Sequence, residues 1–144
     1  MSQTEIHVAI AILTREDKFL CQLRDDIPNI RYPGYWGLFG GHLEAGETPE
    51  IALVRELKEE INYTINHDFR LFGYYPEPGL MRHVFHVPLT VDIEDLTLFE
   101  GWDLGFLTTD DIIAGNCYSP KANMTRSLAL PHQRILLDFI GNRE

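Results

Sequence analysis

Residues 41–63 read GHLEAGETPEIALVRELKEEINY, and no other segment of the chain is as informative. Thr48 is a suitable N-cap residue, and proline at position 49 suits the first turn of a helix. The pattern predicts a helix from Pro49 to about Ile61. Asn62 follows, and asparagine tolerates the left-handed conformation in which many helices end.

One face of this predicted helix is acidic. Its carboxylates are spaced i, i+3 and i+4, and Ala52 leaves the face open one turn earlier: Glu56, Glu59 and Glu60. A second face is apolar, and we expect it to pack against the core: Leu53, Val54, Leu57 and Ile61. Three neighbouring carboxylates repel one another, so one of them tends to hold its proton. A hard divalent cation relieves this repulsion, since magnesium and calcium prefer carboxylate oxygen.

An acidic helix face alone is typical of a solvated surface, but the flanking residues favour a site. Two glycines, Gly40 and Gly41, end a short predicted strand before the helix. Consecutive glycines allow a tight turn that brings backbone carbonyls close to the carboxylates. Arg55 lies beside the glutamates and can hold a carboxylate through paired hydrogen bonds.

The rest of the chain predicts one domain over residues 1–144, of the α/β (α+β) class, with a mixed sheet flanked by helices. Apolar and β-branched segments indicate strands at 5–13, 19–23, 36–39, 69–75, 82–91 and 104–107. Two further helices are expected at 110–113 and 131–140. Residues 25–35 contain two prolines and a glycine and are expected to form a loop.

Composition limits the partners. The chain has 22 acidic and 12 basic residues and a formal charge of −10, so we expect it to repel nucleic acid. A phosphate-bearing ligand then requires a local reversal of the protein's negative electrostatic potential, which a divalent cation supplies.

No signal peptide or long apolar run is present, so no membrane partner is expected. Cys21 and Cys117 are far apart in sequence and are interpreted as buried thiols of a cytoplasmic protein.

The segment from Gly41 to Tyr63 resembles the Nudix box, G-x5-E-x7-R-E-U-x-E-E-x-G-U, where U is a bulky apolar residue. The box's fixed positions agree at six places: Gly41, Glu47, Arg55, Glu56, Glu59 and Glu60. Asn62 stands where the family has glycine, and Phe39 stands where proline is usual before the box. The small size and short termini are similar to MutT-type members, so the resemblance implies a Nudix-type α/β/α sandwich.

The resemblance also implies a hydrolase that uses Mg²⁺ or Mn²⁺ and cleaves a nucleoside diphosphate linked to another group. It assigns metal ligands to Glu56, Glu59 and Glu60, with the Gly40 carbonyl and a loop glutamate, Glu100. Glu47 would orient Arg55 and the start of the helix. The general base is Glu100 or one of the box glutamates. Substrate-binding roles are expected for Arg24, toward a phosphate, and for Gly41 and Trp36.

The substrate is less constrained. A nucleoside triphosphate, oxidised ones included, is expected first, and a nucleotide sugar or ADP-ribose second. Two alternatives from other classes are a non-catalytic nucleotide-binding module, since folds outlive their chemistry, and an isomerase acting on a prenyl diphosphate. The complete carboxylate set disfavours both. A homodimer is allowed by the sequence.

Other polar residues are interpreted structurally. His83 and His86 are three apart on a predicted strand, so they point to opposite faces and are poor joint metal ligands. His132 lies at the start of a predicted helix and could reach a ligand, but a capping or surface role is expected. Arg31 and Arg82 are expected to be solvated.

Overall fold

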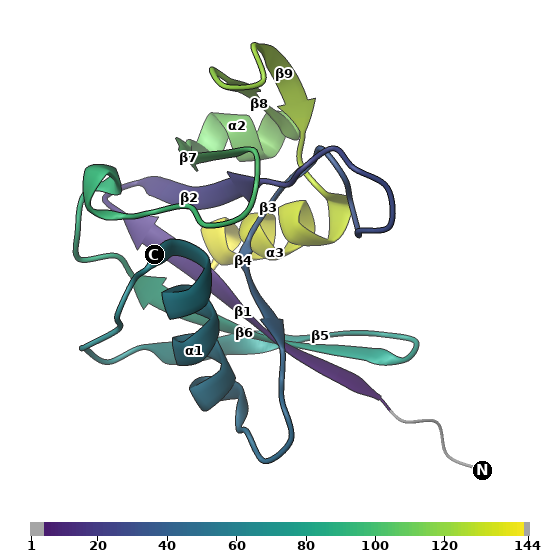
Figure 1. Ribbon diagram of the computed structural model, residues 1–144, viewed down its shortest axis with the longest axis vertical. Helices are drawn as coiled ribbons and strands as arrows, with labels where there is room; N and C mark the ends of the chain where they lie inside the picture. Colours follow the sequence, from purple (N-terminus) through teal and green to yellow (C-terminus); the bar gives the residue numbers. More distant parts are fainter. Residues whose placement is uncertain (1–4, 143–144) are drawn as a thin grey trace.

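The computed structural model describes residues 5–142, which form a seven-stranded mixed sheet, three α-helices and a small separate hairpin (Figure 1). The strands of the main sheet are β1 (Ile6–Arg15), β2 (Lys18–Leu23), β3 (Trp36–Gly37), β4 (Phe39–His42), β5 (Arg70–Glu77), β6 (Leu80–Pro88) and β7 (Asp103–Leu107). The hairpin is β8 (Asn116–Ser119) and β9 (Met124–Ser127). The helices are α1 (Pro49–Ile61), α2 (Thr109–Ala114) and α3 (Leu130–Gly141), with a 3₁₀ turn at Ile93–Asp95.

β1 is the central strand. One of its edges pairs in parallel with β6 along its length, from Ile6 opposite Leu80 to Thr14 opposite Pro88. The other edge is shared, because β4 pairs with its first half and β2 with its end, both antiparallel. β2 also pairs with β3 and β7. The chain therefore changes its pairing partner between these two short strands: β3 pairs with β2, and β4 pairs with β1.

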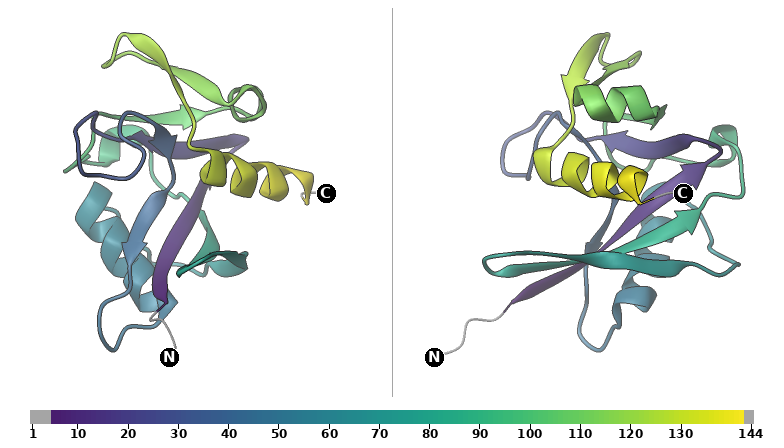
Figure 2. Two further views of the ribbon diagram at one scale, coloured as in Figure 1. Left: turned by 90° about the vertical axis from the view of Figure 1, so that its right-hand side faces the viewer. Right: turned by 180° about the vertical axis from the view of Figure 1, so that it is seen from behind.

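The sheet lies between α1 on one face and α3 on the other (Figure 2). Alternate residues of a strand point to opposite faces, so the sheet has two cores. The core beneath α3 includes Ile12, Phe19, Leu23, Val84, Ile135, Leu136 and Phe139. The core beneath α1 includes Ala11, Leu13, Phe39, Leu53, Leu57, Ile61 and Phe85. This confirms the predicted mixed sheet with helices on its faces.

α1 begins and ends as its sequence predicts. The Thr48 hydroxyl accepts a hydrogen bond from the Ile51 N–H, at 3.2 Å. Asn62 is left-handed, with φ of 58°, and its N–H donates to the carbonyls of Leu57 and Lys58. The predicted apolar face is wrong at one place: Val54 is 37% exposed, and Ala52, expected on the open acidic face, is fully buried. The face of α1 that packs against the core therefore includes Ala52 instead of Val54.

Two other expectations are corrected. The strand expected at 36–39 is two strands that break at Leu38, and Gly40 and Gly41 lie within β4, not in a tight turn. The β8–β9 hairpin was not predicted, because it is largely exposed and lacks the alternating apolar residues that indicate a strand. Among residues 5–142, no helix is long and apolar enough to cross a membrane.

Candidate active site

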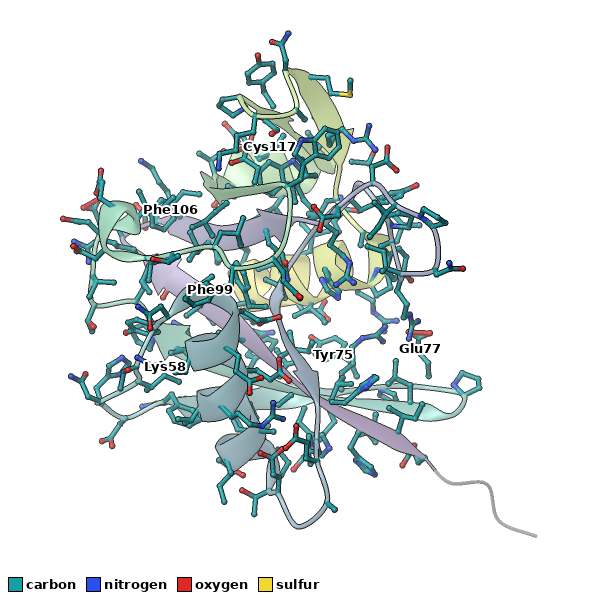
Figure 3. The ribbon with its side chains drawn as sticks, in the orientation of Figure 1. Lys58, Tyr75, Glu77, Phe99, Phe106 and Cys117 are labelled. Carbon is teal, nitrogen blue, oxygen red and sulfur yellow. The ribbon has the colours of Figure 1, made fainter. Side chains whose placement is uncertain are left out.

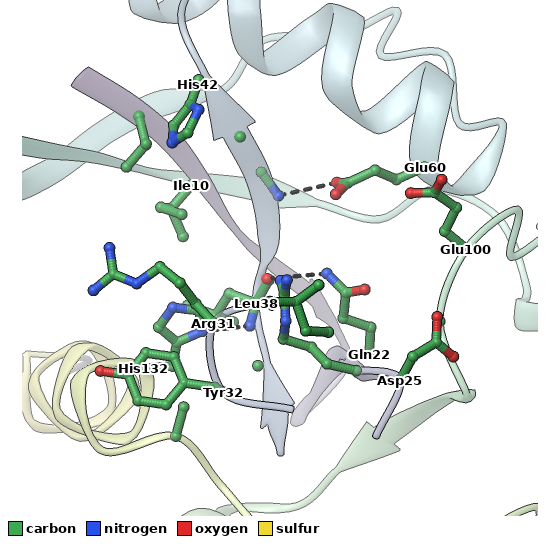
Figure 4. Close-up of a pocket in the computed structure, with 18 of the residues that line it drawn as sticks. Ile10, Gln22, Asp25, Arg31, Tyr32, Leu38, His42, Glu60, Glu100 and His132 are labelled. Carbon is green, nitrogen blue, oxygen red and sulfur yellow. Dashed lines mark hydrogen bonds between the residues drawn. The ribbon is translucent and has the colours of Figure 1, made fainter. Parts of the chain in front are cut away.

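A cavity of about 540 Å³ lies where the chain crosses from β2 to β1, and residues far apart in the sequence line it (Figure 4). Figure 4 shows Glu60 and Glu100 at one end and His132 and Tyr32 at the other. We call these the acidic end and the distal end. The volume is within the range of small-molecule sites.

The acidic end is built by the last turn of α1 and the loop before β7. The Gly40 N–H of β4 donates to Glu60 Oε1, at 3.0 Å. The Phe99 N–H donates to the Glu60 carbonyl, at 3.1 Å, and this bond holds the loop that carries Glu100 against the helix. Burial and the neighbouring Glu56 raise the pKa of Glu60 to about 8, against the Gly40 bond and Arg24, which lower it. Among the three glutamates of this face, Glu60 is thus the one whose charged form is disfavoured by its surroundings.

Arg55 organises the outer side of α1. Its Nε and Nη2 donate to the two carboxylate oxygens of Glu47, at 2.7 and 2.9 Å. Its Nη1 donates to Glu56 and Glu59, at 2.9 and 3.0 Å, and its Nη2 also reaches the His42 carbonyl. The paired hydrogen bonds from Arg55 lower the pKa of Glu47 to about 2. The helix is therefore tied to the loop that precedes it.

The donor set fits a hard divalent cation. In residues 5–142 no three carboxylate, imidazole or thiol side chains are grouped to hold an ion as they stand, because Glu56 and Glu59 point to Arg55. An ion held beside Glu60 would draw Glu56 and Glu59 toward it. Gly41 leaves room for the Glu56 carboxylate, since a Cβ on it would lie 2.5 Å from Glu56 Cδ.

The floor of the cavity is the break between β3 and β4. Leu38 pairs with no strand, and two side chains replace the strand partners. Its N–H donates to Nδ1 of His132, at 2.8 Å, and its carbonyl accepts from Nε2 of Gln22, at 3.4 Å (Figure 4). His132 lies in the first turn of α3, so this bond joins the helix to the strand that carries Gly40.

The expected site residues fall into three groups. Five line the cavity: Arg24, Gly40, Gly41, Glu60 and Glu100. Four form the ion-pair network on the outer side of α1, in which Arg55 binds the three glutamates: Glu47, Arg55, Glu56 and Glu59. Trp36 lies outside both, because it is 1% exposed within the core and its Nε1 donates to the Cys117 carbonyl.

Sequence reasoning missed part of the distal end. His132 lines the cavity, and it neither caps a helix nor lies on the open surface. Arg82 is also corrected, since it is 5% exposed, lines the cavity and pairs with Glu77. No local pattern marks either residue, because only the packing of α3 and β6 brings them together. His83 and His86 point to opposite faces as expected, toward His7 and Thr14.

Figure 3 draws the side chains on the ribbon, and its Phe99 label marks the loop beside the end of α1. Both cysteines are free thiols. Cys21 is buried as expected, and burial raises its pKa. Cys117 is only partly buried.

Comparison with known proteins shows that the chain is similar to enzymes that cleave nucleotide pyrophosphate bonds. An ADP-ribose pyrophosphatase of Methanocaldococcus jannaschii is 30% identical over 140 residues, covering 94% of this chain and 75% of that protein. An 8-oxo-dGTP diphosphatase of Proteus vulgaris is 32% identical over 84 residues, covering 48% of this chain and 69% of that protein. A MutT structure from a study of the Aliivibrio salmonicida and Vibrio cholerae proteins has a TM-score of 0.74 at 22% identity, covering 97% of this chain and all of that one.

The NUDIX domain model matches residues 4–126, which include the whole of α1 and the loop that carries Glu100. The box residues, the sheet between two helices and this match agree, and the chain therefore belongs to the Nudix hydrolase family.

Proposed function

We propose that the chain, acting as a single domain, cleaves the pyrophosphate bond of a nucleoside triphosphate, oxidised ones included, and releases a mononucleotide. The observation that carries this proposal is the acidic end of the cavity. There the partly buried Glu60 accepts the Gly40 N–H beside Glu56, and its carboxyl group has a raised pKa. Burying a carboxylate next to a second one is unfavourable unless a cation joins them.

Each residue then has a role. Glu56, Glu59 and Glu60 would hold Mg²⁺ or Mn²⁺, with the Gly40 carbonyl and Glu100 nearby. When bound, such ions neutralise charge on the phosphates and acidify a water. Arg55 and Glu47 position the helix and its carboxylates. Arg24 lines the cavity close enough to lower the pKa of Glu60, so its guanidinium can contact a phosphate there.

A magnesium-dependent hydrolysis screen across nucleotide classes tests the proposal. In Glu60→Gln we expect turnover to fall by about 100-fold or more, because losing even a supporting residue of a metal site typically costs roughly 10–100-fold. Glu50→Gln is the matched control, since Glu50 is exposed on the same helix. Magnesium-dependent turnover by Glu60→Gln at the Glu50→Gln rate would contradict the assignment.

ADP-ribose is a second candidate, because the relative that matches 94% of this chain is named an ADP-ribose pyrophosphatase. The products separate the two. A nucleoside triphosphate gives a mononucleotide and pyrophosphate, whereas ADP-ribose gives AMP and ribose 5-phosphate. Comparing kcat/KM for the two substrates in one preparation decides between them.

A further inference from the structure

The His132 ring is fixed in one orientation and one tautomer. Its Nδ1 accepts the Leu38 N–H at 2.8 Å, so Nδ1 carries no proton. Gly37 makes this position possible, because a Cβ there would lie 2.8 Å from Nδ1. The hydrogen of the neutral ring is therefore on Nε2.

The ring also stays neutral. Burial and the surrounding guanidinium groups of Arg82, Arg24 and Arg31 lower the pKa of His132 to about 3. Among residues 5–142, no group forms a hydrogen bond with Nε2, although the ring lines the cavity. An Nε2–H donor is thus left for a ligand at neutral pH.

The surroundings combine apolar surface, which suits a planar ligand group, with N–H donors. Ile27, Ile30, Tyr32 and Leu80 supply apolar surface around the cavity, and the Tyr32 ring lies 6.5 Å from the His132 ring. Arg82 already has a carboxylate partner in Glu77, so its charge is balanced within the protein. The polar groups beside His132 are donors, and they match carbonyl oxygens rather than amino groups.

We propose that His132 is a specificity-determining residue, which donates its Nε2–H to a carbonyl oxygen of the substrate's nucleobase. The inference rests on the proposed function, because that function places the phosphates at the acidic end and the base at the distal end. A base with an amino group at this position would put two donors face to face, and both would lose their hydrogen bonds. Keto nucleobases are therefore selected over amino ones.

Hypoxanthine and adenine are a suitable pair, because they differ in a keto or an amino group at carbon 6 and in the proton on N1. We expect IMP to bind roughly tenfold or more tightly than AMP by calorimetry with Mg²⁺ present, since an unpaired buried donor costs that much. ITP should exceed ATP in kcat/KM through KM, with kcat little changed.

Two variants assign this preference to the ring. His132→Phe removes the donor, so the IMP-to-AMP ratio of affinities should fall to about one. His132→Asn can accept the Leu38 N–H through its oxygen and donate through its amide, so it should restore part of the ratio. Arg134→Gln, exposed on the same helix, should leave the ratio unchanged.

Equal binding of IMP and AMP by the wild-type protein, or binding of neither, would overturn the inference without any variant. A preference that survives in His132→Phe would overturn it as well. Equal affinities that weaken together with salt would instead identify the distal end as a phosphate site. Absence of magnesium-dependent cleavage for every nucleotide is a separate result, which rejects the proposed function, because the monophosphates test binding without cleavage.

Discussion

Arg55 shows how one side chain can set the geometry of a site without lining the cavity. Its guanidinium spans the turn before α1 through Glu47 and the His42 carbonyl, and the helix itself through Glu56 and Glu59. The planar fork makes this possible, since five N–H donors lie in fixed directions. A metal that draws Glu56 and Glu59 away would leave the bond to Glu47 intact.

Arg55→Lys should therefore impair the site while keeping its charge. A lysine ammonium cannot form the fork with Glu47, and kcat/KM should fall by about 10–100-fold, as for other residues that orient metal ligands. The free energy of unfolding, from urea titration, should fall by about 1–3 kcal/mol. Arg15→Lys is the matched control, because Arg15 pairs with the exposed Asp92, and such pairs contribute about 0–1 kcal/mol. Equal effects of the two substitutions would contradict this role.

His132 should also give the protein an acid-sensitive stability. Its pKa is about 3 in the folded protein against an ordinary 6.5, so in between the unfolded chain binds a proton that the folded one does not. The free energy of unfolding then falls as the pH drops below about 6.5, with a slope of at most about 1.4 kcal/mol per pH unit. His132→Asn should lose this contribution, so its stability relative to wild type should rise on acidification. Urea titrations between about pH 7 and pH 5 measure the difference, and a constant difference would reject the interpretation.

At the scale of the element, the end of α1 explains how the chain departs from the family's box. Asn62, where the box has glycine, holds a left-handed φ of 58°, a conformation that glycine adopts freely, and its N–H closes the helix on Leu57 and Lys58. Asn62→Ala should destabilise the protein by about 1–2 kcal/mol, because alanine lacks the side chain that tolerates this conformation. Asn62→Gly should be neutral or slightly stabilising. Thermal unfolding of the two variants checks this, and equal melting temperatures would contradict it.

The contact between β4 and α1 gives a second test. A Cβ at Gly41 would lie 2.5 Å from Glu56 Cδ, whereas one at Gly73 would have an ordinary contact of 3.6 Å with Tyr75. Gly41→Ala should therefore displace the Glu56 carboxylate and reduce magnesium-dependent turnover by at least about tenfold. Gly73→Ala should retain it. Full activity in Gly41→Ala would show that Glu56 does not need this space.

Local patterns predicted most elements because each carries its own signal. α1 has a cap, an N-terminal proline and an apolar face, and the long strands have continuous apolar runs. The same signals placed Glu56, Glu59 and Glu60 of the candidate site on one helix. They did not reveal the distal end, because Arg82 and His132 come from different elements and line one cavity only when α3 packs on the sheet. The prediction that Val54 packs in the core was wrong, because α1 turns Ala52 rather than Val54 toward the sheet.

At the scale of the whole molecule, the formal charge of −10 makes cation binding a matter of stability as well as catalysis. Any ligand that binds only the folded state stabilises it, by about 2.7 kcal/mol at 100 times its Kd. Magnesium should therefore raise the melting temperature more than sodium chloride at equal ionic strength, because sodium only screens the surface charge. The excess should vanish in Glu60→Gln and persist in Glu50→Gln, and EDTA should reverse it. A magnesium effect no larger than that of sodium, or one that Glu60→Gln retains, would show that the acidic end of the cavity does not hold the ion.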